Sequence, residues 1–149
     1  MITFKRTNSS DANFQKLVHL LDENLALKNG DKNEFFAKFN KTNFIDNVVV
    51  AFDNNKAVAC GALKKYDSNT IEIKRMFVLA EYRGKAIGYA VLTNLEKWAK
   101  ELNYSKTILE TGKQMKEAIY LYQKSGYEII ENYEPYKEEK TSVCFAKII

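Results

Sequence analysis

The segment IEIKRMFVLAEYRGKAIGYAVLTNLEKWAKEL, Ile71 to Leu102, decides the fold because it joins a strand to a helix through a basic turn that contains glycine. Residues 71–79 are apolar and β-branched enough to predict the strand. A turn that directs several main-chain N–H groups outward, followed at once by a helix N-terminus, presents unpaired donors and the positive end of the helix dipole. The sequence therefore predicts a ligand that carries phosphate groups.

Upstream of this segment, the apolar spacing predicts a strand over Ile2–Arg6 and then two helices. Ser9 or Ser10 can cap the first helix, and Asn29 with Gly30 ends it. Its apolar stripe consists of Phe14, Leu17, Val18, Leu21 and Leu25. A short second helix is predicted over Asp31–Asn40, with an apolar face made of Phe35, Phe36 and Phe39.

Two β-rich runs, Asn47–Phe52 and Ala57–Leu63, are joined by Asp53, Asn54 and Asn55, residue types that tolerate the positive φ of a hairpin turn. A turn at Asp67–Asn69 then leads into the strand Ile71–Leu79. The later elements are a helix with a stripe of Ile87, Val91, Leu95, Trp98 and Leu102, a strand over Lys106–Thr111, a helix over Glu117–Lys124 and strands over Tyr127–Glu131 and Ser142–Ile148. The pattern predicts a mixed α/β (α+β) protein around one largely antiparallel sheet.

The composition fits a single domain over residues 1–149, because one proline and six glycines leave no long flexible linker. The chain holds 23 Lys and Arg against 19 Asp and Glu, a net charge of +4 that is too evenly spread to predict nucleic-acid binding. No window approaches the length of a membrane span, and the N-terminus lacks the apolar segment of a signal peptide. We therefore expect a cytoplasmic protein without a membrane partner.

The cysteines and the histidine do not form a recognisable metal motif. Cys60 and Cys144 each lie inside an apolar run, far apart in sequence and without a CxxC pair, so buried reduced thiols are favoured over a disulfide or metal site. His19 points away from the apolar stripe of its helix, which favours a surface position over a catalytic one. We expect no metal cofactor.

The turn itself reads Arg83-Gly84-Lys85-Ala86-Ile87-Gly88, and a glycine-containing turn before a helix is, taken alone, more often only a turn. The whole order of parts, however, resembles the GNAT superfamily of acetyl-CoA-dependent N-acetyltransferases. That family's signature is (Gln/Arg)-x-x-Gly-x-(Gly/Ala) between the fourth strand and the third helix. Arg83 takes the first place and Gly88 the last, while Ala86 replaces the inner glycine. A positive φ at Ala86 would hinder the approach of a phosphate, and a helical φ would be harmless.

The resemblance continues through ILETG, Ile108–Gly112, and EAIYLYQKSGYEII, Glu117–Ile130. It implies a GNAT-like fold with a mostly antiparallel sheet of six to seven strands and about four helices. Residues 1–40 match only in general layout. In this family that region shapes the acceptor site, so the acceptor is the property that the sequence specifies least.

The resemblance also implies how acetyl-CoA is held. The pantetheine arm lies against the strand at Met76–Val78, with the Val78 N–H as oxyanion donor, and the pyrophosphate lies on the amides of Gly84–Tyr89, with Arg83 and Lys85 adding charge at the rim. The implied coenzyme residues are Met76, Phe77, Val78, Arg83, Gly84, Lys85, Ala86, Ile87, Gly88, Tyr89 and Gln114.

Two residues are candidates for proton transfer. Glu72 alternates on one strand face with Lys74, Met76 and Val78 and matches the family's glutamate base, although an exposed carboxylate paired with Lys74 is an equally good interpretation. Tyr122 matches the family's tyrosine acid, whereas its spacing alone favours a core aromatic residue.

One loop and one charged run lie near the C-terminus. Tyr133 and Tyr136 flank Pro135 in a polar loop, where aromatic packing is favoured over a role at the acceptor pocket. The run Lys137–Lys140 is expected to be a solvated turn.

The resemblance therefore implies an N-acetyltransferase that acts on a primary amine of a small molecule or peptide, as a monomer or homodimer. The alternative is a catalytically silent acyl-CoA-binding sensor or interaction module. Nucleic-acid binding is a third class, and the interspersed acidic residues argue against it.

Overall fold

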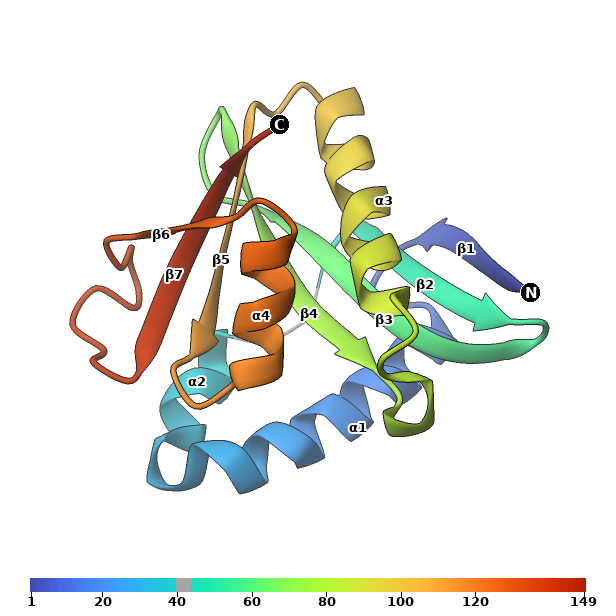
Figure 1. The fold of residues 1–149 in the computed structure, drawn as a ribbon, viewed down its shortest axis with the longest axis horizontal. Coiled ribbons are helices and arrows are strands. Elements are labelled where there is room, and N and C mark those ends of the chain that lie inside the picture. The colour runs from blue at the N-terminus through green and yellow to red at the C-terminus, as the bar shows by residue number, and fades with distance from the viewer. Residues whose placement is uncertain (40–43) are drawn as a thin grey trace. The chain divides into compact units, whose positions relative to one another are not determined.

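The computed structural model describes residues 1–39 and 44–149, and this part of the chain holds seven strands and four α-helices (Figure 1). In chain order these are β1 (Ile2–Thr7), α1 (Ala12–Asn29), α2 (Asn33–Phe39), β2 (Asn47–Asp53), β3 (Lys56–Lys65), β4 (Thr70–Val78), α3 (Ile87–Glu101), β5 (Lys106–Gly112), α4 (Lys116–Lys124), β6 (Glu128–Ile130) and β7 (Ser142–Ile148). The strand order in the sheet is β1-β2-β3-β4-β5-β7-β6. The predicted fold class is confirmed.

The chain forms two compact units. The first unit comprises Met1–Lys64 and Lys74–Leu95, and the second comprises Lys65–Ile73 and Glu96–Ile149. Strand β4 and helix α3 each contribute residues to both units. The single domain expected for residues 1–149 stays a prediction. No helix of the described residues is long and apolar enough to cross a membrane.

The first unit begins with three antiparallel strands, β1, β2 and β3, which run side by side in Figure 1. The predicted hairpin between β2 and β3 is confirmed, and Asn54 supplies its positive φ of 55°. The predicted cap of α1 is wrong, because Asp11 is the N-cap and accepts from the Phe14 N–H at 3.0 Å. Ser9 is engaged elsewhere: its hydroxyl accepts from the Ile45 N–H at 3.1 Å.

The predicted helix over Asp31–Asn40 is only partly correct. A single 3₁₀ turn occupies Gly30–Lys32, and α2 follows as a separate helix. Phe36 is buried and meets Phe35 edge to face, with ring centroids 5.2 Å apart. The side chain of Phe39, and Asn40 as a whole, lie outside the described residues.

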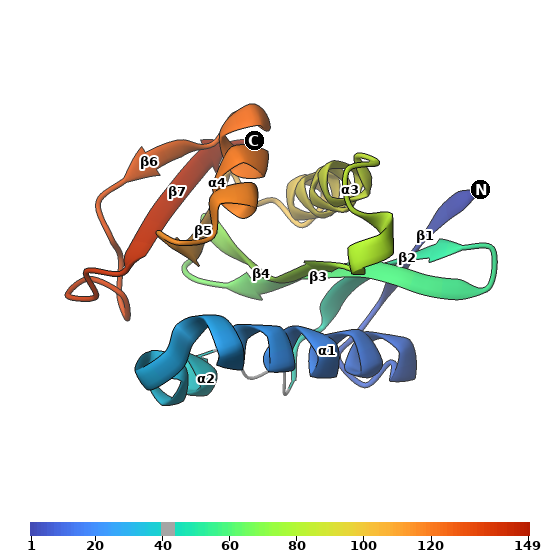
Figure 2. The same cartoon turned by 60° about the horizontal axis from the view of Figure 1, so that its bottom comes forward.

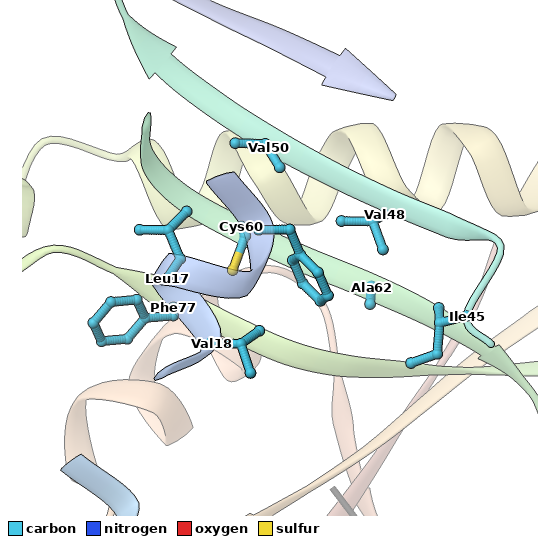
Figure 3. Close-up of a cluster of buried hydrophobic side chains, with 9 residues drawn as sticks. Leu17, Val18, Ile45, Val48, Val50, Cys60, Ala62 and Phe77 are labelled. Atoms are coloured by element: carbon cyan, nitrogen blue, oxygen red, sulfur yellow. The ribbon is translucent and has the colours of Figure 1, made fainter. Parts of the chain in front are cut away.

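Helix α1 covers one face of β2 and β3 in the first unit (Figure 2). Side chains alternate along a strand, so one face of each strand supplies every second residue to the same core. That core, drawn in Figure 3, consists of Phe14, Leu17, Val18, Ile45, Val48, Val50, Cys60, Ala62 and Phe77. The predicted stripe of α1 is confirmed at its buried members Phe14, Leu17 and Val18. His19 points away from this core, and its side chain is 76% exposed, as predicted.

The first half of α3 covers the opposite face of these strands (Figure 2). The buried residues of the helix are Ile87, Val91, Leu92, Leu95 and Ala99. Leu102 does not belong to this stripe as predicted, since the helix ends at Glu101 and Leu102 is 40% exposed. Trp98 is only partly buried. The buried residues thus recur with the 3.6-residue period of a helix, and the buried face includes Leu92 and Ala99 in addition to the predicted Ile87, Val91 and Leu95.

Gly61 allows this helix to lie close to the sheet. A Cβ at residue 61 would come within 2.6 Å of the Met76 Sδ and 2.7 Å of the Leu95 Cδ1. We expect Gly61→Val to lower the free energy of unfolding by about 1–3 kcal/mol, because interiors are packed too tightly to absorb added methyl groups. Urea unfolding monitored by circular dichroism measures this change. Lys64→Val, at an exposed position of the same strand, is the matched control and should change the stability by less than about 0.5 kcal/mol. Equal changes in the free energy of unfolding for the two variants would contradict the close packing of α3 against Gly61.

The second unit is built around β7, which pairs antiparallel with both β5 and β6. The first residues of β4 pair in parallel with β5, from Thr70 opposite Lys106 to Glu72 opposite Ile108. The strand predicted over Tyr127–Glu131 is shorter and starts at Glu128, because the Tyr127 N–H donates to the Tyr122 carbonyl at 3.0 Å at the end of α4.

Both cysteines are buried and free, as predicted. Burial raises the pKa of the Cys60 thiol to about 12 against the opposing charge of Arg75, and burial raises that of Cys144 to about 11. Neither thiol therefore forms a reactive thiolate near neutral pH.

Candidate functional site

The predicted phosphate-binding turn, called the anion cradle below, comprises residues 83–89 and lies between the end of β4 and the first turn of α3. After a 3₁₀ turn over Ala80–Tyr82, the chain takes positive φ at Gly84, 78°, and at Ala86, 63°. The hydrogen bonding of the helix starts at Ala90, whose N–H donates to the Ala86 carbonyl at 3.1 Å. Within the described residues, the N–H groups from Gly84 to Tyr89 therefore have no main-chain acceptor. A run of free amides at the start of a 15-residue helix is suited to a phosphate or diphosphate.

Ala86 adopts the left-handed conformation that glycine adopts without strain. With its φ of 63°, the Ala86 methyl group stands where the family signature has a bare Cα, which is the conformation expected to hinder the approach of a phosphate. The residue lies on the exposed surface, so its Cβ is not forced into the core. The left-handed conformation costs an L-residue about 1–2 kcal/mol. This strain is located at the centre of the cradle.

We therefore expect Ala86→Gly to raise the free energy of unfolding by up to about 1 kcal/mol, because relief of strain outweighs the added entropy of the unfolded chain. Ala90→Gly is the control, since residue 90 is helical and the same change there should lower the stability by about 0.5–1 kcal/mol. Thermal unfolding of both variants measures the two changes in stability. Two changes of the same sign would show that the conformation at Ala86 carries no strain.

The two basic side chains of the cradle contact protein groups. Arg83 turns back toward β4, where its Nε donates to the Val78 carbonyl at 3.0 Å and its guanidinium lies 5.8 Å from the centroid of the Phe77 ring. The Lys85 Nζ lies 5.3 Å from the centroid of the Tyr82 ring. The Arg83 contacts join the turn to the end of β4.

Asp53 fixes the Tyr82 ring that Lys85 contacts. The Tyr82 hydroxyl donates to the Asp53 Oδ2 at 2.8 Å, and this bond is the main reason that the pKa of Asp53 lies below its ordinary value. The same bond raises the pKa of Tyr82. Asp53, the last residue of β2, thus holds the Tyr82 ring in the position where Lys85 contacts it.

The end of β4 contains an irregular backbone conformation at Arg75. Arg75 has a φ of 58°, a bulge-like conformation that reverses the order of faces along a strand. After it, Phe77 packs in the α1 core and Met76 lies on the side of Gly61 and α3. The alternation predicted for Glu72, Lys74, Met76 and Val78 stays a prediction.

Glu72 lies in a buried cluster of the second unit. It is only 7% exposed, so its interpretation as an exposed carboxylate is wrong, and its Oε2 accepts from the Tyr133 hydroxyl at 2.7 Å. Burial, and then the charge of Glu72, raise the pKa of Tyr133 far above the ordinary tyrosine value. Tyr133 therefore stays protonated and holds Glu72 in one orientation.

Tyr122 is buried on α4, with its ring 5.9 Å from that of Tyr127 and 6.0 Å from that of Phe145. Burial raises the pKa of its phenol well above the ordinary value, and the charge of Glu110 raises it further. The hydroxyl therefore keeps its proton across the neutral range, which an acid requires. The packing predicted from its spacing is present as well, so packing and a chemical role are compatible.

The loop between β6 and β7 contributes more than the sequence indicated. Packing of its aromatic residues was favoured, and Tyr136 is indeed buried, with its ring 5.8 Å from that of Tyr133. The contact of Tyr133 with Glu72 was missed, and the flanking of Pro135 by two tyrosines was its only signal in the sequence. The run Lys137–Lys140 is not wholly solvated, because Glu139 is buried and its carboxylate accepts from the Thr141 hydroxyl at 2.5 Å.

The last predicted site residue, Gln114, belongs to the second unit. Gln114 is exposed just after β5, and its side-chain amide lies over the Cα of Gly112. A shallow recess of about 520 Å³ in the second unit is lined by residues 67–70, Ser105, Lys106 and Ile148, none of which was predicted as a site residue. Among the residues that the structure describes, no three His, Cys, Asp or Glu side chains are grouped as metal ligands would be.

Three comparisons place the chain among known proteins. The sequence model of the acetyltransferase (GNAT) family matches residues 14–127. The chain is 31% identical over 99 residues to the uncharacterised N-acetyltransferase YsnE of Bacillus subtilis, with 65% of this chain and 66% of that protein covered. It is 33% identical over 100 residues to an IAA acetyltransferase of Azospirillum brasilense, with 66% of this chain and 65% of that protein covered. The match thus spans about two thirds of each relative's length.

Solved structures share the fold along nearly the whole chain. A candidate acyl-CoA N-acyltransferase from Klebsiella pneumoniae has a TM-score of 0.82 at 26% identity, with 99% of this chain and 97% of that chain covered. A GNAT family acetyltransferase from Elizabethkingia anophelis, solved with acetyl-CoA bound, has a TM-score of 0.74 at 22% identity, with 99% and 98% covered. Because the family match covers residues 14–127, the chain belongs to the acetyltransferase (GNAT) family.

Proposed function

We propose that the protein is an N-acetyltransferase that moves an acetyl group from acetyl-CoA to a primary amine of a small molecule or peptide, by direct attack in a ternary complex. The observation that carries this proposal is the row of free amides from Gly84 to Tyr89 at the start of α3, in a chain of the acetyltransferase family. The acetyl-CoA bound to the Elizabethkingia protein supports the choice of donor.

The coenzyme fits the main chain of the first unit. The amides of residues 84–89 take the diphosphate, and Arg83 and Lys85 reinforce them with charge. The strand segment Met76–Val78 takes the pantetheine arm, with the Val78 N–H directed to the thioester oxygen, and Gln114 is a further partner for an amide of that arm. Bound acetyl-CoA supplies an activated acyl carbon.

Glu72 is the proposed base. An alkylamine with a pKa of about 10 arrives mostly protonated at neutral pH, so a group must accept its proton before it attacks. Glu72 is buried and is oriented by the Tyr133 hydroxyl at 2.7 Å. Tyr133 touches the base rather than the reacting atoms and is a positioning residue.

Tyr122 is the proposed acid. The departing thiolate takes a proton, and the buried phenol of Tyr122, whose pKa is raised, carries one at neutral pH. The Glu72 carboxylate thus accepts the first proton of the ammonium group and passes it to solvent, and the phenol proton goes to sulfur. The second proton, which the nitrogen loses as the amide forms, restores the phenol, so one proton is released to solvent per turnover.

The alternative is a catalytically silent acyl-CoA-binding sensor that keeps the cradle. The burial of Glu72 and Tyr122 together with their hydrogen-bonding and aromatic partners favours catalysis, since a sensor needs neither side chain. A cytoplasmic location and a monomeric or homodimeric state remain predictions.

The test is thiol release from acetyl-CoA, followed with a thiol reagent across a panel of small primary amines, amino acids and peptides. We expect release that depends on the presence of one class of amine and that is first order in enzyme. Binding of acetyl-CoA without release for any member of the panel would favour the sensor. Absence of coenzyme binding would contradict both functions.

A further inference from the structure

Arg75 is a buried cation next to α1. Its side chain is 2% exposed, and its Nη2 donates to the Asp22 Oδ1 on that helix. The Asp22 side chain is 59% exposed, so water weakens its attraction for the guanidinium. The two side chains belong to the first unit and come from positions 53 residues apart in the chain.

The other nitrogens of this guanidinium are unsatisfied. Within residues 1–39 and 44–149, neither the Nε nor the Nη1 of Arg75 has a hydrogen-bond partner, and both atoms are buried. They are the only buried side-chain nitrogen or oxygen atoms of the described residues in this condition. Buried donors without acceptors are strongly disfavoured, so such a pair points to a ligand that supplies the acceptors.

The backbone at Arg75 is held in an uncommon conformation. Its φ is 58°, in the region that non-glycine residues seldom adopt, and the Cys60 thiol donates to its carbonyl at 3.4 Å. The side chain lies on the α1 side of the strand, where it meets Asp22. Local strain of this kind is retained where the position of a side chain matters for binding or chemistry.

We propose that Arg75 binds a carboxylate of the acyl acceptor, so that the acceptor is an amino acid or another amine that carries a carboxylate. A carboxylate accepts from several guanidinium N–H groups at once and matches the charge that Asp22 offsets only in part. A neutral amide would leave that charge uncompensated. The assignment of the ligand as the acceptor rests on the function proposed above.

The position along β4 fits an acceptor. Arg75 precedes Met76–Val78, the segment assigned to the thioester end of the donor, and the Val78 N–H lies about 10 Å further along the strand. The proposal therefore requires an acceptor whose amino group extends from a carboxylate at Arg75 toward the Val78 end of β4.

The experiment compares each amino acid of the panel with its own carboxamide. The amine of the carboxamide loses its proton more easily, so a preference for the acid cannot arise from amine reactivity. We expect wild-type kcat/KM to favour the acids by about 100-fold or more, mainly through KM. Arg75→Met should remove this preference, and Arg75→Lys should retain about a tenth of it, because it keeps the charge and loses the planar donors.

The control variant is Arg6→Met, at an exposed arginine of β1, which should leave the preference unchanged. Calorimetric titration of the wild-type protein with the same acids and carboxamides gives a readout that needs neither turnover nor a folded variant, and only the acids should bind. Equal acylation or equal binding of acids and carboxamides by the wild type would overturn the proposal, as would an undiminished preference in Arg75→Met.

The outcomes separate this inference from the proposed function. Thiol release with acids and carboxamides alike supports the enzyme and rejects the role of Arg75. Binding of acids that Arg75→Met abolishes, without thiol release from any pair, rejects the enzyme and keeps Arg75 as the carboxylate site.

Discussion

Replacement of Tyr122 by phenylalanine is expected to lower kcat by about 10²–10⁴-fold while the Kd for acetyl-CoA stays nearly unchanged. The change removes one hydroxyl and retains the ring that packs against Tyr127 and Phe145, so the fold of α4 is preserved. Steady-state kinetics and calorimetric titration with acetyl-CoA give the two quantities separately.

Tyr120→Phe is the matched control, because Tyr120 lies on the same helix and is 66% exposed. It should change neither kcat nor Kd. The raised pKa of Tyr122 adds a second expectation: activity should not fall between about pH 7 and pH 9 through ionisation of this phenol, since that loss begins only as the pH approaches the pKa of the folded state. A parallel loss of kcat and coenzyme affinity in Tyr122→Phe would reassign the residue to packing.

Replacement of Glu72 by glutamine is expected to lower kcat/KM for the amine by about 10²–10⁴-fold, because glutamine cannot accept the amine proton. Glutamine still accepts from the Tyr133 hydroxyl, which lies 2.7 Å from the Glu72 Oε2, so the cluster remains packed while the base is lost. The measurement is kcat/KM as a function of pH.

Tyr133→Phe provides the corresponding test of positioning. We expect a smaller fall in kcat/KM, about 10-fold, because the carboxylate persists without the hydroxyl that orients it. Glu128→Gln, an exposed carboxylate of β6, is the control and should leave the profile intact. If the profile of Glu72→Gln coincides with that of the wild type, another group or bulk water accepts the proton.

The elements that the sequence predicted well are those whose causes are local. The hairpin at Asn54 follows from residue types that tolerate positive φ, and the α1 stripe follows from a 3.6-residue period. The order of strand, glycine-containing turn and helix is local as well, because it lies within a few dozen consecutive residues. Phosphate binding by this turn stays a prediction. The sheet order could be inferred only through the family resemblance.

The features that sequence missed depend on contacts between distant residues. Tyr133 reaches Glu72 across 61 positions, and Arg75 reaches Asp22 across 53. The cap of α1 is a smaller case: Ser9, Ser10 and Asp11 are all good capping residues, and the bond of Ser9 to Ile45 leaves Asp11 as the cap. The conformation of Ala86 could not be predicted either, since alanine gives no local preference for positive φ.

The most direct test of the account follows the main-chain amides of residues 84–89 by NMR during titration of the isotope-labelled protein with acetyl-CoA. We predict that the N–H signals of Gly84 to Tyr89 shift strongly and become protected from exchange at the same concentrations at which the coenzyme binds, and that coenzyme A without the acetyl group has the same effect. Saturation of the protein with acetyl-CoA while these amides keep their free positions and exchange rates would show that the diphosphate is not held by this turn.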